Sequence, residues 1–307
     1  MQAKQVCLRR APGAGLGLSL LGAAAFGLFA QSSARPAFQA ASIKPSPAGG
    51  SEPMHRAMGV GYRPGGGIVA QNTSLLMLIQ FAYANHDAPH WLPLPASQVV
   101  GGPSWMGTSA YDIEAKPAAE TDPAHSWLML QSLLAGRFKL ALHTETRELP
   151  TYDLTVAASG PKLPAAKEAG CVSFPPGTAP HAVPGKVDCG YVSGPISGST
   201  TGQFRIEGRK VHVSDLVREL SSILGRPVLD KTGYTAEFDL RLNFAPSDAL
   251  MGMPGFGGPG NPGGSRANAS LPDIFAALEG QLGLKLVPDK GPVAVLVIDH
   301  AERPAAD

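Results

Sequence analysis

A pair of histidines has the spacing at which two side chains of one helix bind the same metal ion. His86 and His90 are four residues apart, so their imidazoles would share a helix face. Pro89 lies between them, however, and the surrounding residues are typical of a loop. No glutamate accompanies the pair in the arrangement of a metalloprotease. We therefore expect no metal site here. Serines outside any nucleophile-elbow motif and carboxylates such as Glu145 and Glu148 suggest no catalytic constellation either.

The string Asp230-Lys231-Thr232-Gly233 resembles the phosphorylated aspartate motif of P-type ATPases. The downstream Gly-Asp-x-x-x-Asp loop of those pumps is absent, and Tyr234 stands where they carry threonine. Similar turn chemistry recurs at Asp289-Lys290-Gly291, and Asp followed by Gly is favoured in tight turns. We interpret both strings as hairpin turns. The expected structural turn residues are therefore Asp230, Gly233, Asp289 and Gly291, with Gly233 and Gly291 at positive φ.

The turns belong to a pattern of one helix followed by two strands. In its last occurrence Ser270 caps a helix that ends at Gly283, and strands cover residues 284–287 and 293–298. The preceding occurrence begins at Ser214, and its helix ends at Gly225. The stop and turn glycines have the same spacing in both, since Gly225 precedes Gly233 as Gly283 precedes Gly291. Equal spacing at two places predicts an internal repeat.

Two earlier segments show a looser form of the same pattern. One has a helix over residues 126–134, a stop at Gly136 and strands over residues 138–143 and 152–156. The other has a helix over residues 75–83 and strands at residues 99–101 and 111–115. A helix with two strands cannot bury its apolar faces alone. We therefore expect an α+β fold of repeated helix–strand–strand (βαββ-like) units, packed as two α/β-layered subdomains.

Long loops interrupt these units, because the chain has 37 Gly and 29 Pro among 307 residues. We expect a first α+β domain at residues 35–160 and a second at residues 202–307. A Pro/Gly-rich loop at residues 161–201 connects them, and a Gly/Pro/Met-rich linker occupies residues 245–269 within the second. Residues 251–264 of this linker have the composition of a disordered segment.

The N-terminal segment, residues 1–34, has the features of a signal peptide. Lys4, Arg9 and Arg10 precede an uncharged run from Gly13 to Ala30, and small residues follow. The run is short for a transmembrane helix, although an uncleaved anchor is the alternative. We expect cleavage between residues 30 and 35 and a periplasmic or extracellular location. The membrane would then be contacted only through an uncleaved signal peptide.

Export into an oxidising compartment also explains the cysteines. Cys171 and Cys189 lie near each other in a Pro/Gly-rich stretch, which predicts one disulfide that closes a loop. A pair of metal ligands is the alternative, but the spacing fits no zinc pattern and only His181 lies between them. Cys7 precedes the apolar run and is not a lipoprotein acceptor.

Charge argues against nucleic acid as a partner. Removal of the three basic residues of the signal peptide from the 25 in the chain leaves 22, against 24 acidic residues. The chain has no basic block and no interleaving of basic and aromatic residues. We expect no cofactor.

These segments together resemble the Solibacter-type conserved hypothetical family of exported acidobacterial proteins. The matching strings are Phe38–Pro45, Arg63–Ala84, Val100–Lys116, Met129–Leu163, Gly225–Leu242 and Leu282–Pro304. That family has no established function and no assigned catalytic residues. The helix–strand–strand unit also looks like the short N-terminal domain of secretins and TonB-dependent receptors, a protein-docking module.

The expected function is therefore a non-catalytic module that docks an envelope protein or an extracellular ligand. Short units of this kind leave strand edges that can accept a partner strand. The alternatives are a hydrolase-type enzyme with a site between units, and a self-associating structural component of the envelope. Converging polar side chains in a pocket would favour the enzyme.

Overall fold

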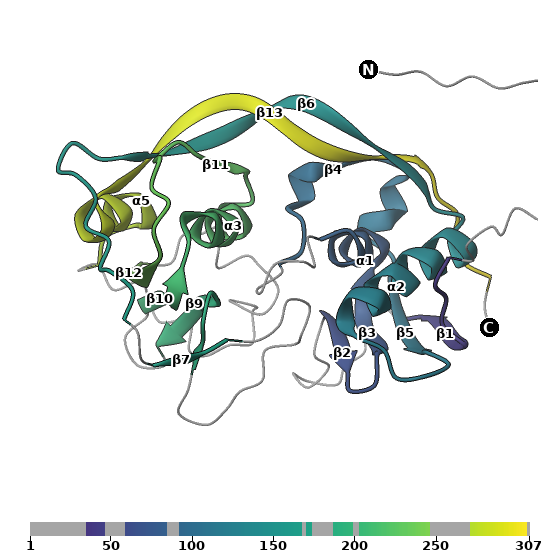
Figure 1. The fold of residues 1–307 in the computed structure, drawn as a ribbon. Helices are drawn as coiled ribbons and strands as arrows, with labels where there is room; N and C mark the ends of the chain where they lie inside the picture. Colours follow the sequence, from purple (N-terminus) through teal and green to yellow (C-terminus); the bar gives the residue numbers. More distant parts are fainter. Residues whose placement is uncertain are drawn as a thin grey trace, which may run out of the picture. The chain divides into compact units, whose positions relative to one another are not determined.

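The computed structural model describes residues 35–46, 59–84, 92–167, 170–173, 187–198, 203–245 and 271–305. It has the expected α+β composition, with helices packed on antiparallel sheets (Figure 1). The predicted signal peptide, His86, His90 and residues 251–264 lie outside the described residues. The division into domains at residues 35–160 and 202–307 stays a prediction.

The first sheet has four strands in the order β1-β5-β3-β2, and every pairing in it is antiparallel. Its strands are β1 (Ala40–Pro45), β2 (Gly59–Arg63), β3 (Gly67–Ser74) and β5 (Ala110–Lys116). Burial alternates along β5, because one face of the sheet packs on helices α1 (Leu75–Ala82) and α2 (Pro123–Arg137). Trp127, Phe138 and Leu78 are fully buried in the core between them.

The second sheet has three antiparallel strands in the order β12-β10-β9. These are β9 (Val192–Gly198), β10 (Gln203–Val211) and β12 (Phe238–Phe244). Helix α3 (Val213–Leu224), helix α5 (Ile274–Ala277) and the following π-helical turn η3 (Leu278–Leu282) complete this second core. Phe238, Leu216 and Leu278 are fully buried there.

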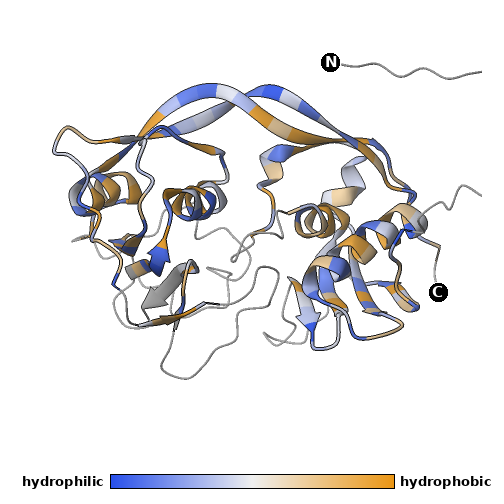
Figure 2. Cartoon of the chain, in the orientation of Figure 1, coloured by the Kyte–Doolittle hydropathy of each residue, from blue (hydrophilic) through white to orange (hydrophobic). Residues whose placement is uncertain are grey.

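Two long strands form a ribbon that contributes to both cores. Strand β6 (Ala141–Val156) pairs antiparallel with β13 (Leu284–His300) along almost its whole length. Short strands flank the ribbon: β4 (Val99–Gly101) runs parallel to β13, and β11 (Val228–Asp230) runs parallel to β6. Figure 2 shows long hydrophilic stretches along the ribbon, whereas α1 is coloured almost entirely as hydrophobic.

Several predicted helix ends are confirmed. Gly225 and Gly283 follow their helices with φ of 60° and 64°, the left-handed conformation that glycine adopts at low cost. The predicted helix at residues 75–83 is α1, and the Ser74 side chain accepts a hydrogen bond from the Met77 amide. Strand β12 alternates between buried and more exposed residues.

Other predicted ends are wrong. Helix α2 begins after Asp122, whose carboxylate accepts from the His125 amide, and it continues through Gly136. Helix α3 is capped by His212, so Ser214 lies inside it. Asp273, expected three residues after a cap, is itself the N-cap of α5 and accepts from the Ala276 amide. Ser270 lies outside the described residues. The carboxylates of Asp122 and Asp273 define these ends because each accepts a backbone N–H of the first turn.

The predicted hairpin turn at Asp289-Lys290-Gly291 is also wrong. All three residues lie inside β13, where they pair with Thr151, Pro150 and Leu149 of β6. Gly291 is not among the residues with positive φ. A Cβ at Gly291 would instead meet Leu229 Cδ1 at 2.8 Å. Only the end of the Leu229 side chain would have to move to admit a Cβ, so Gly291 is not required by a turn conformation.

The stretch at residues 161–201, expected to be a loop, contains strands. Strand β9 is the edge of the second sheet, and the short strands β7 (Cys171–Val172) and β8 (Val187–Asp188) pair parallel with each other. The high Gly and Pro content of this stretch hides β9 from the sequence pattern. These pairings place the cysteines next to the second sheet.

Candidate binding surface

The string Asp230-Lys231-Thr232-Gly233 forms a turn after β11. The predicted hairpin is wrong, however, because β11 pairs with β6 whereas β12 pairs with β10. The Asp230 carboxylate accepts hydrogen bonds from the Thr232 amide at 2.8 Å and from the Thr232 hydroxyl at 2.7 Å. Gly233 has φ of 66° and a Cβ there would meet no atom within 4 Å. An aspartate that binds the backbone two residues later is a turn-forming arrangement. The contacts of Asp230 are thus those of a turn, and Gly233 has the predicted positive φ.

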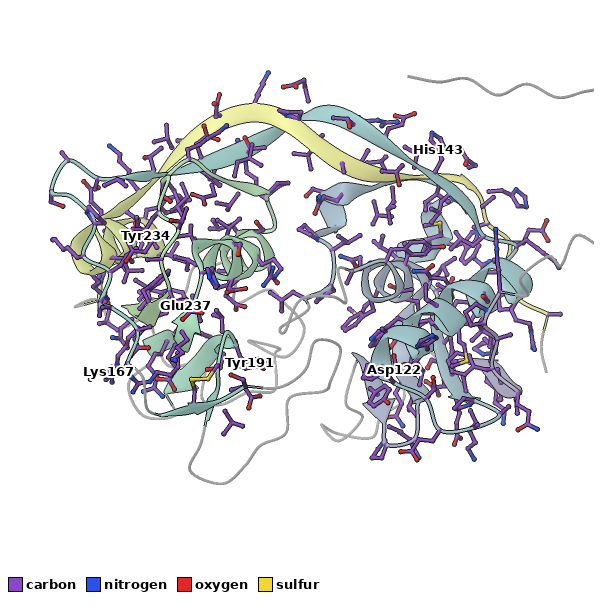
Figure 3. The ribbon with its side chains drawn as sticks, in the orientation of Figure 1. Asp122, His143, Lys167, Tyr191, Tyr234 and Glu237 are labelled. Carbon is purple, nitrogen blue, oxygen red and sulfur yellow. A yellow bond between two sulfur atoms is a disulfide. The ribbon has the colours of Figure 1, made fainter. Side chains whose placement is uncertain are left out.

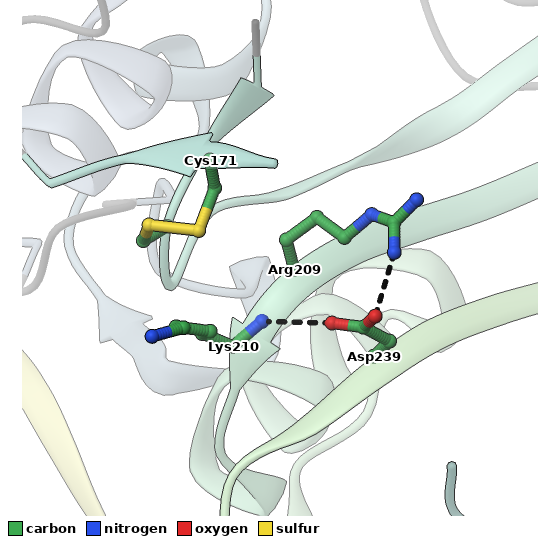
Figure 4. Close-up of a disulfide and its surroundings, with 5 residues drawn as sticks. Cys171, Arg209, Lys210 and Asp239 are labelled. Atoms are coloured by element: carbon green, nitrogen blue, oxygen red, sulfur yellow. Dashed lines mark hydrogen bonds and ion pairs between the residues drawn. A yellow bond between two sulfur atoms is a disulfide. The ribbon is translucent and has the colours of Figure 1, made fainter. Parts of the chain in front are cut away.

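The two cysteines are joined in the structure. Cys171 and Cys189 form a disulfide, in agreement with the expected pairing. Figure 4 shows it beside β10, where Arg209 forms an ion pair with Asp239 at 2.6 Å. The Gly190 amide donates to the Arg209 carbonyl at 2.8 Å. The backbone contacts with Arg209 hold the segment that leads into β9 against β10, and the disulfide ties β7 to this segment.

We expect the double variant Cys171→Ser/Cys189→Ser to unfold at a lower denaturant concentration than the wild type. Opening a loop of this size costs about 3 kcal/mol in the chain-entropy model, and less where both ends are tethered by other pairings. Urea unfolding measures the loss. Wild-type protein treated with reductant should match the double variant. Equal midpoints before and after reduction would contradict the prediction.

Strand β2 is an edge of the first sheet. It pairs with β3, and within the described residues no strand pairs with its other side. An edge strand presents a row of backbone N–H and C=O groups that can bind another strand. Its sequence, Gly-Val-Gly-Tyr-Arg, has no proline or lysine, the residues that commonly protect edges.

The other edges of the first and second sheets are obstructed. Strand β1 carries Lys44 and Pro45, and β9 carries Pro195. The outer side of β12 is occupied, because the Asn243 amide donates to Gln281 Oε1 at 3.0 Å and Gln281 Nε2 donates to the Asn243 carbonyl at 2.7 Å. Among the edges of these two sheets, β2 is therefore the best suited to accept a partner strand.

Two hydrogen bonds show which groups of β2 face outward. The Arg63 carbonyl accepts from the Gly66 amide at 3.1 Å, and the Gly59 carbonyl accepts from the Thr73 hydroxyl at 3.2 Å. Both donors lie on the β3 side. Backbone direction alternates along an antiparallel strand, so the backbone groups of Val60 and Tyr62 point away from β3. Their side chains pack against the first core.

A hollow of about 470 Å³ lies at the end of β2. Arg63, Glu114, Lys116 and Glu120 are among its lining residues, together with Val69 of the sheet. Lys116 Nζ lies 3.6 Å from Glu114 Oε1. In the described part of the chain, no ion pair engages Arg63 or Glu120. A bound strand would thus have charged groups of both signs at one end.

A polar cluster is centred on His143 of the ribbon, which Figure 3 labels. Its Nδ1 lies 2.9 Å from Asp299 Oδ1, and its Nε2 lies 3.0 Å from Glu145 Oε1. Arg147 Nε donates to Glu145 Oε2 at 2.8 Å. Asp299 is the extra residue at the register shift between Ile298 and His300. A bulge of this kind redirects a side chain, here toward His143.

This cluster does not have the arrangement of a hydrolase. Both ring nitrogens of His143 face carboxylates, so the charged imidazolium is favoured and no nitrogen is available as a base. Asp299 also borders a hollow of about 640 Å³ that includes Ser132. The Ser132 hydroxyl donates to the Leu128 carbonyl of its own helix at 3.2 Å. The geometry of Ser132, His143 and Asp299 therefore does not form a catalytic triad.

Hydrogen bonds from Asp299 and then Glu145 raise the pKa of His143 above its ordinary value of 6.5. In an NMR titration we expect Asp299→Asn to move the midpoint of His143 down toward 6.5. Asp289→Asn, with the same loss of charge on the same strand, should leave it unchanged. The charged cluster stabilises the fold fully below pH 6.5, and this contribution disappears as the pH rises through the raised pKa. Identical midpoints in wild type and Asp299→Asn would refute the assignment.

Two acidic side chains on α3 are buried, with 6% of Asp215 and 1% of Glu219 exposed. Asp215 caps its helix, since its carboxylate accepts from the His212 amide at 2.8 Å and pairs with Arg218. Tyr191, labelled in Figure 3, has a raised pKa, mainly through burial and then through Glu219 and Asp188. No sequence pattern indicates Glu219, because Tyr191, whose pKa it raises, is far from it in the sequence. Across the described residues, no group of three or more His, Cys, Asp or Glu side chains could hold a metal ion.

The comparison with family models decides the relationship of the chain. The model described as "Protein of unknown function (DUF3738)" matches residues 76–301, which is more than half of the sequence. The chain belongs to DUF3738. In this DUF3738 protein the match begins in α1 and ends just after β13, so β1, β2 and β3 precede it. No curated protein and no solved structure matches the chain. None of the described helices of this DUF3738 protein is long and apolar enough to cross a membrane.

Proposed function

We propose that this protein is an exported, non-catalytic docking module that binds an extended segment of an envelope protein or an extracellular ligand along β2. The observation that carries the proposal is the edge of β2, to which no other described strand pairs, with the backbone groups of Val60 and Tyr62 directed outward. Strand addition at a sheet edge is a common mode of peptide recognition, in which backbone hydrogen bonds supply affinity.

Two further features support export and docking. The charged N-terminus, the short apolar run after it and the small residues that end it have the order of a signal peptide. The disulfide between Cys171 and Cys189 suits an oxidising compartment. Membership of the Solibacter-type exported family, and repeated helix–strand–strand units like those of secretins and TonB-dependent receptors, belong to the same proposal. N-terminal sequencing of the exported protein should find a start between residues 31 and 35.

The test of docking is Val60→Pro. Proline removes an outward N–H and leaves the bonds to β3 in place, so the sheet should persist while a partner strand loses a bond and meets the ring. We expect binding to weaken at least about tenfold, which corresponds to about 1.4 kcal/mol. The measurement is quantitative capture of periplasmic proteins by tagged mature protein, followed by titration of the captured partner.

Val60→Thr is the matched control, because it keeps both the β-branched shape and the N–H. A second blocking variant is Gly61→Lys, since a Cβ at Gly61 meets nothing closer than Val69 O at 3.7 Å and lysine guards sheet edges. Equal binding by wild type and both blocking variants would exclude β2 as the docking edge. Capture of the chain's own copies through β2 would instead identify self-association.

A further inference from the structure

The order of elements is the same in two parts of the chain. Residues 59–156 contain β2, β3, α1, β4, β5, α2 and β6, and residues 192–300 contain β9, β10, α3, β11, β12, α5 with η3, and β13. The sheets repeat this correspondence, since β5-β3-β2 in one has the order of β12-β10-β9 in the other. We infer that these parts are two copies of one unit that exchange strands, so that neither is complete without the other.

An irregular junction supports the equivalence of the two parts. Strand β3 has one extra residue between Ala70 and Thr73, opposite Ile113 and Tyr111. Strand β10 has one extra residue between Gly208 and Val211, opposite Leu240 and Phe238. The bulge lies just before the helix in each case. A bulge at one position is common, but the same bulge at the same place in both sheets indicates one architecture.

The bulges also share their chemistry. Each contains a non-glycine residue at positive φ, Asn72 at 48° and Lys210 at 49°. The amide of each donates to an aspartate on the neighbouring strand, Asn72 to Asp112 at 2.8 Å and Lys210 to Asp239 at 3.3 Å. Figure 4 shows the second of these pairs. A left-handed non-glycine residue is uncommon, so two held by equivalent carboxylates favour common origin over coincidence.

The ribbon is the place where the two copies exchange strands. The residue pairs of the ribbon are arranged symmetrically on either side of the pair formed by Glu148 and Pro292. The difference between these two residue numbers, added to the number of any residue of β6, gives the number of its counterpart on β13. Strand β11 runs beside Tyr152–Leu154 of β6, and β4 runs beside the counterpart stretch of β13, Leu296–Ile298. The long strand of each copy thus pairs with the short flanking strand of the other copy.

The cores show the same exchange. Leu154 of the first copy is fully buried in the second core, and Ile298 of the second copy is buried in the first. These two residues are counterparts, separated by the same difference in residue number. Each core therefore lacks a buried side chain unless the other copy is present. The second copy is in this sense the obligatory partner of the first, and the interface is the ribbon with β4 and β11.

The test cuts the folded mature protein between the copies. A protease site is inserted between Ser173 and Val187 in the variant Cys171→Ser/Cys189→Ser, so no covalent link survives cleavage. We expect the two fragments to elute together at the mass of the uncut chain and to unfold in one transition. Fragments that separate while each keeps its own fold would overturn the inference.

A second measurement leaves the disulfide in place, in case the cysteine variant does not fold. In Leu154→Ala, amide hydrogen exchange should accelerate at least about tenfold in α3 and α5, which belong to the other copy. The matched control is Leu78→Ala in α1, which should accelerate exchange in α1 and α2 most strongly. Unchanged exchange in α3 and α5 of Leu154→Ala would also overturn the inference. The docking proposal does not depend on either result.

Discussion

Gly283→Ala should be the most damaging glycine substitution in the described chain. Gly283 has φ of 64°, where a side chain costs about 1 to 2 kcal/mol. A Cβ there would also lie 2.0 Å from the Gly160 carbonyl oxygen, and backbone atoms cannot move aside as the end of a side chain can. The Lys162 amide, which donates to the Leu282 carbonyl at 2.8 Å, would be displaced as well. We expect a total loss of about 3 kcal/mol or more in urea unfolding.

Gly225→Ala is the control for this prediction. Gly225 ends α3 with nearly the same φ, 60°, but a Cβ there would meet no atom within 4 Å. The loss of stability in Gly225→Ala should therefore be limited to the cost of the left-handed backbone conformation, about 1 kcal/mol. Equal losses for the two variants would mean that the contact with Gly160 does not constrain the fold.

Ile298→Ala should lower the stability of the first core although the residue lies near the C-terminal end of the described chain. Ile298 is 5% exposed, belongs to the first core and pairs with Leu142 and Gly101 across two strand ladders. Truncation of a buried isoleucine leaves a cavity and costs about 2 to 5 kcal/mol. The Ile298 side chain also leaves little room for a side chain at Gly102, because a Cβ there would lie 3.0 Å from Ile298 Cγ2. Thermal or urea unfolding measures the loss.

The control is Val287→Ala on the same strand. Val287 is 38% exposed, so its truncation removes little buried surface and should cost well under about 1 kcal/mol. A loss for Ile298→Ala no larger than that for Val287→Ala would contradict the packing of β13 in the first core.

Local signals in the sequence predict some elements and miss others for physical reasons. The 3.6-residue period locates α1 and α3, and stop glycines locate the ends at Gly225 and Gly283, because these features depend on neighbours in sequence. The same signals wrongly predict two strand–turn–strand pieces in place of the ribbon. A string such as Pro288–Gly291 has turn composition, and only its pairing with β6 keeps it extended.

The candidate binding edge is equally difficult to predict. In β2 the apolar residues Val60 and Tyr62 alternate with glycine, and Pro64-Gly65-Gly66 is a recognisable turn. The hairpin of β2 and β3 therefore has a local sequence signal, although it lies outside the helix–strand–strand pattern. That β2 is an edge depends on the order of four strands, which no local pattern contains. Likewise the His143 cluster needs Asp299, which lies far away in sequence.

The pairing of β6 with β13 imposes an order on folding during synthesis. Thr144 pairs with Leu296, so the whole stretch from residue 145 to residue 296 must emerge before this pair can form. Contacts between such distant residues form slowly, because the intervening chain must first lose conformational freedom. Until then a strand of 16 residues has an unsatisfied edge that can pair with any nearby chain. The emerging chain therefore exposes the edge of β6 to unwanted pairing until β13 has been synthesised.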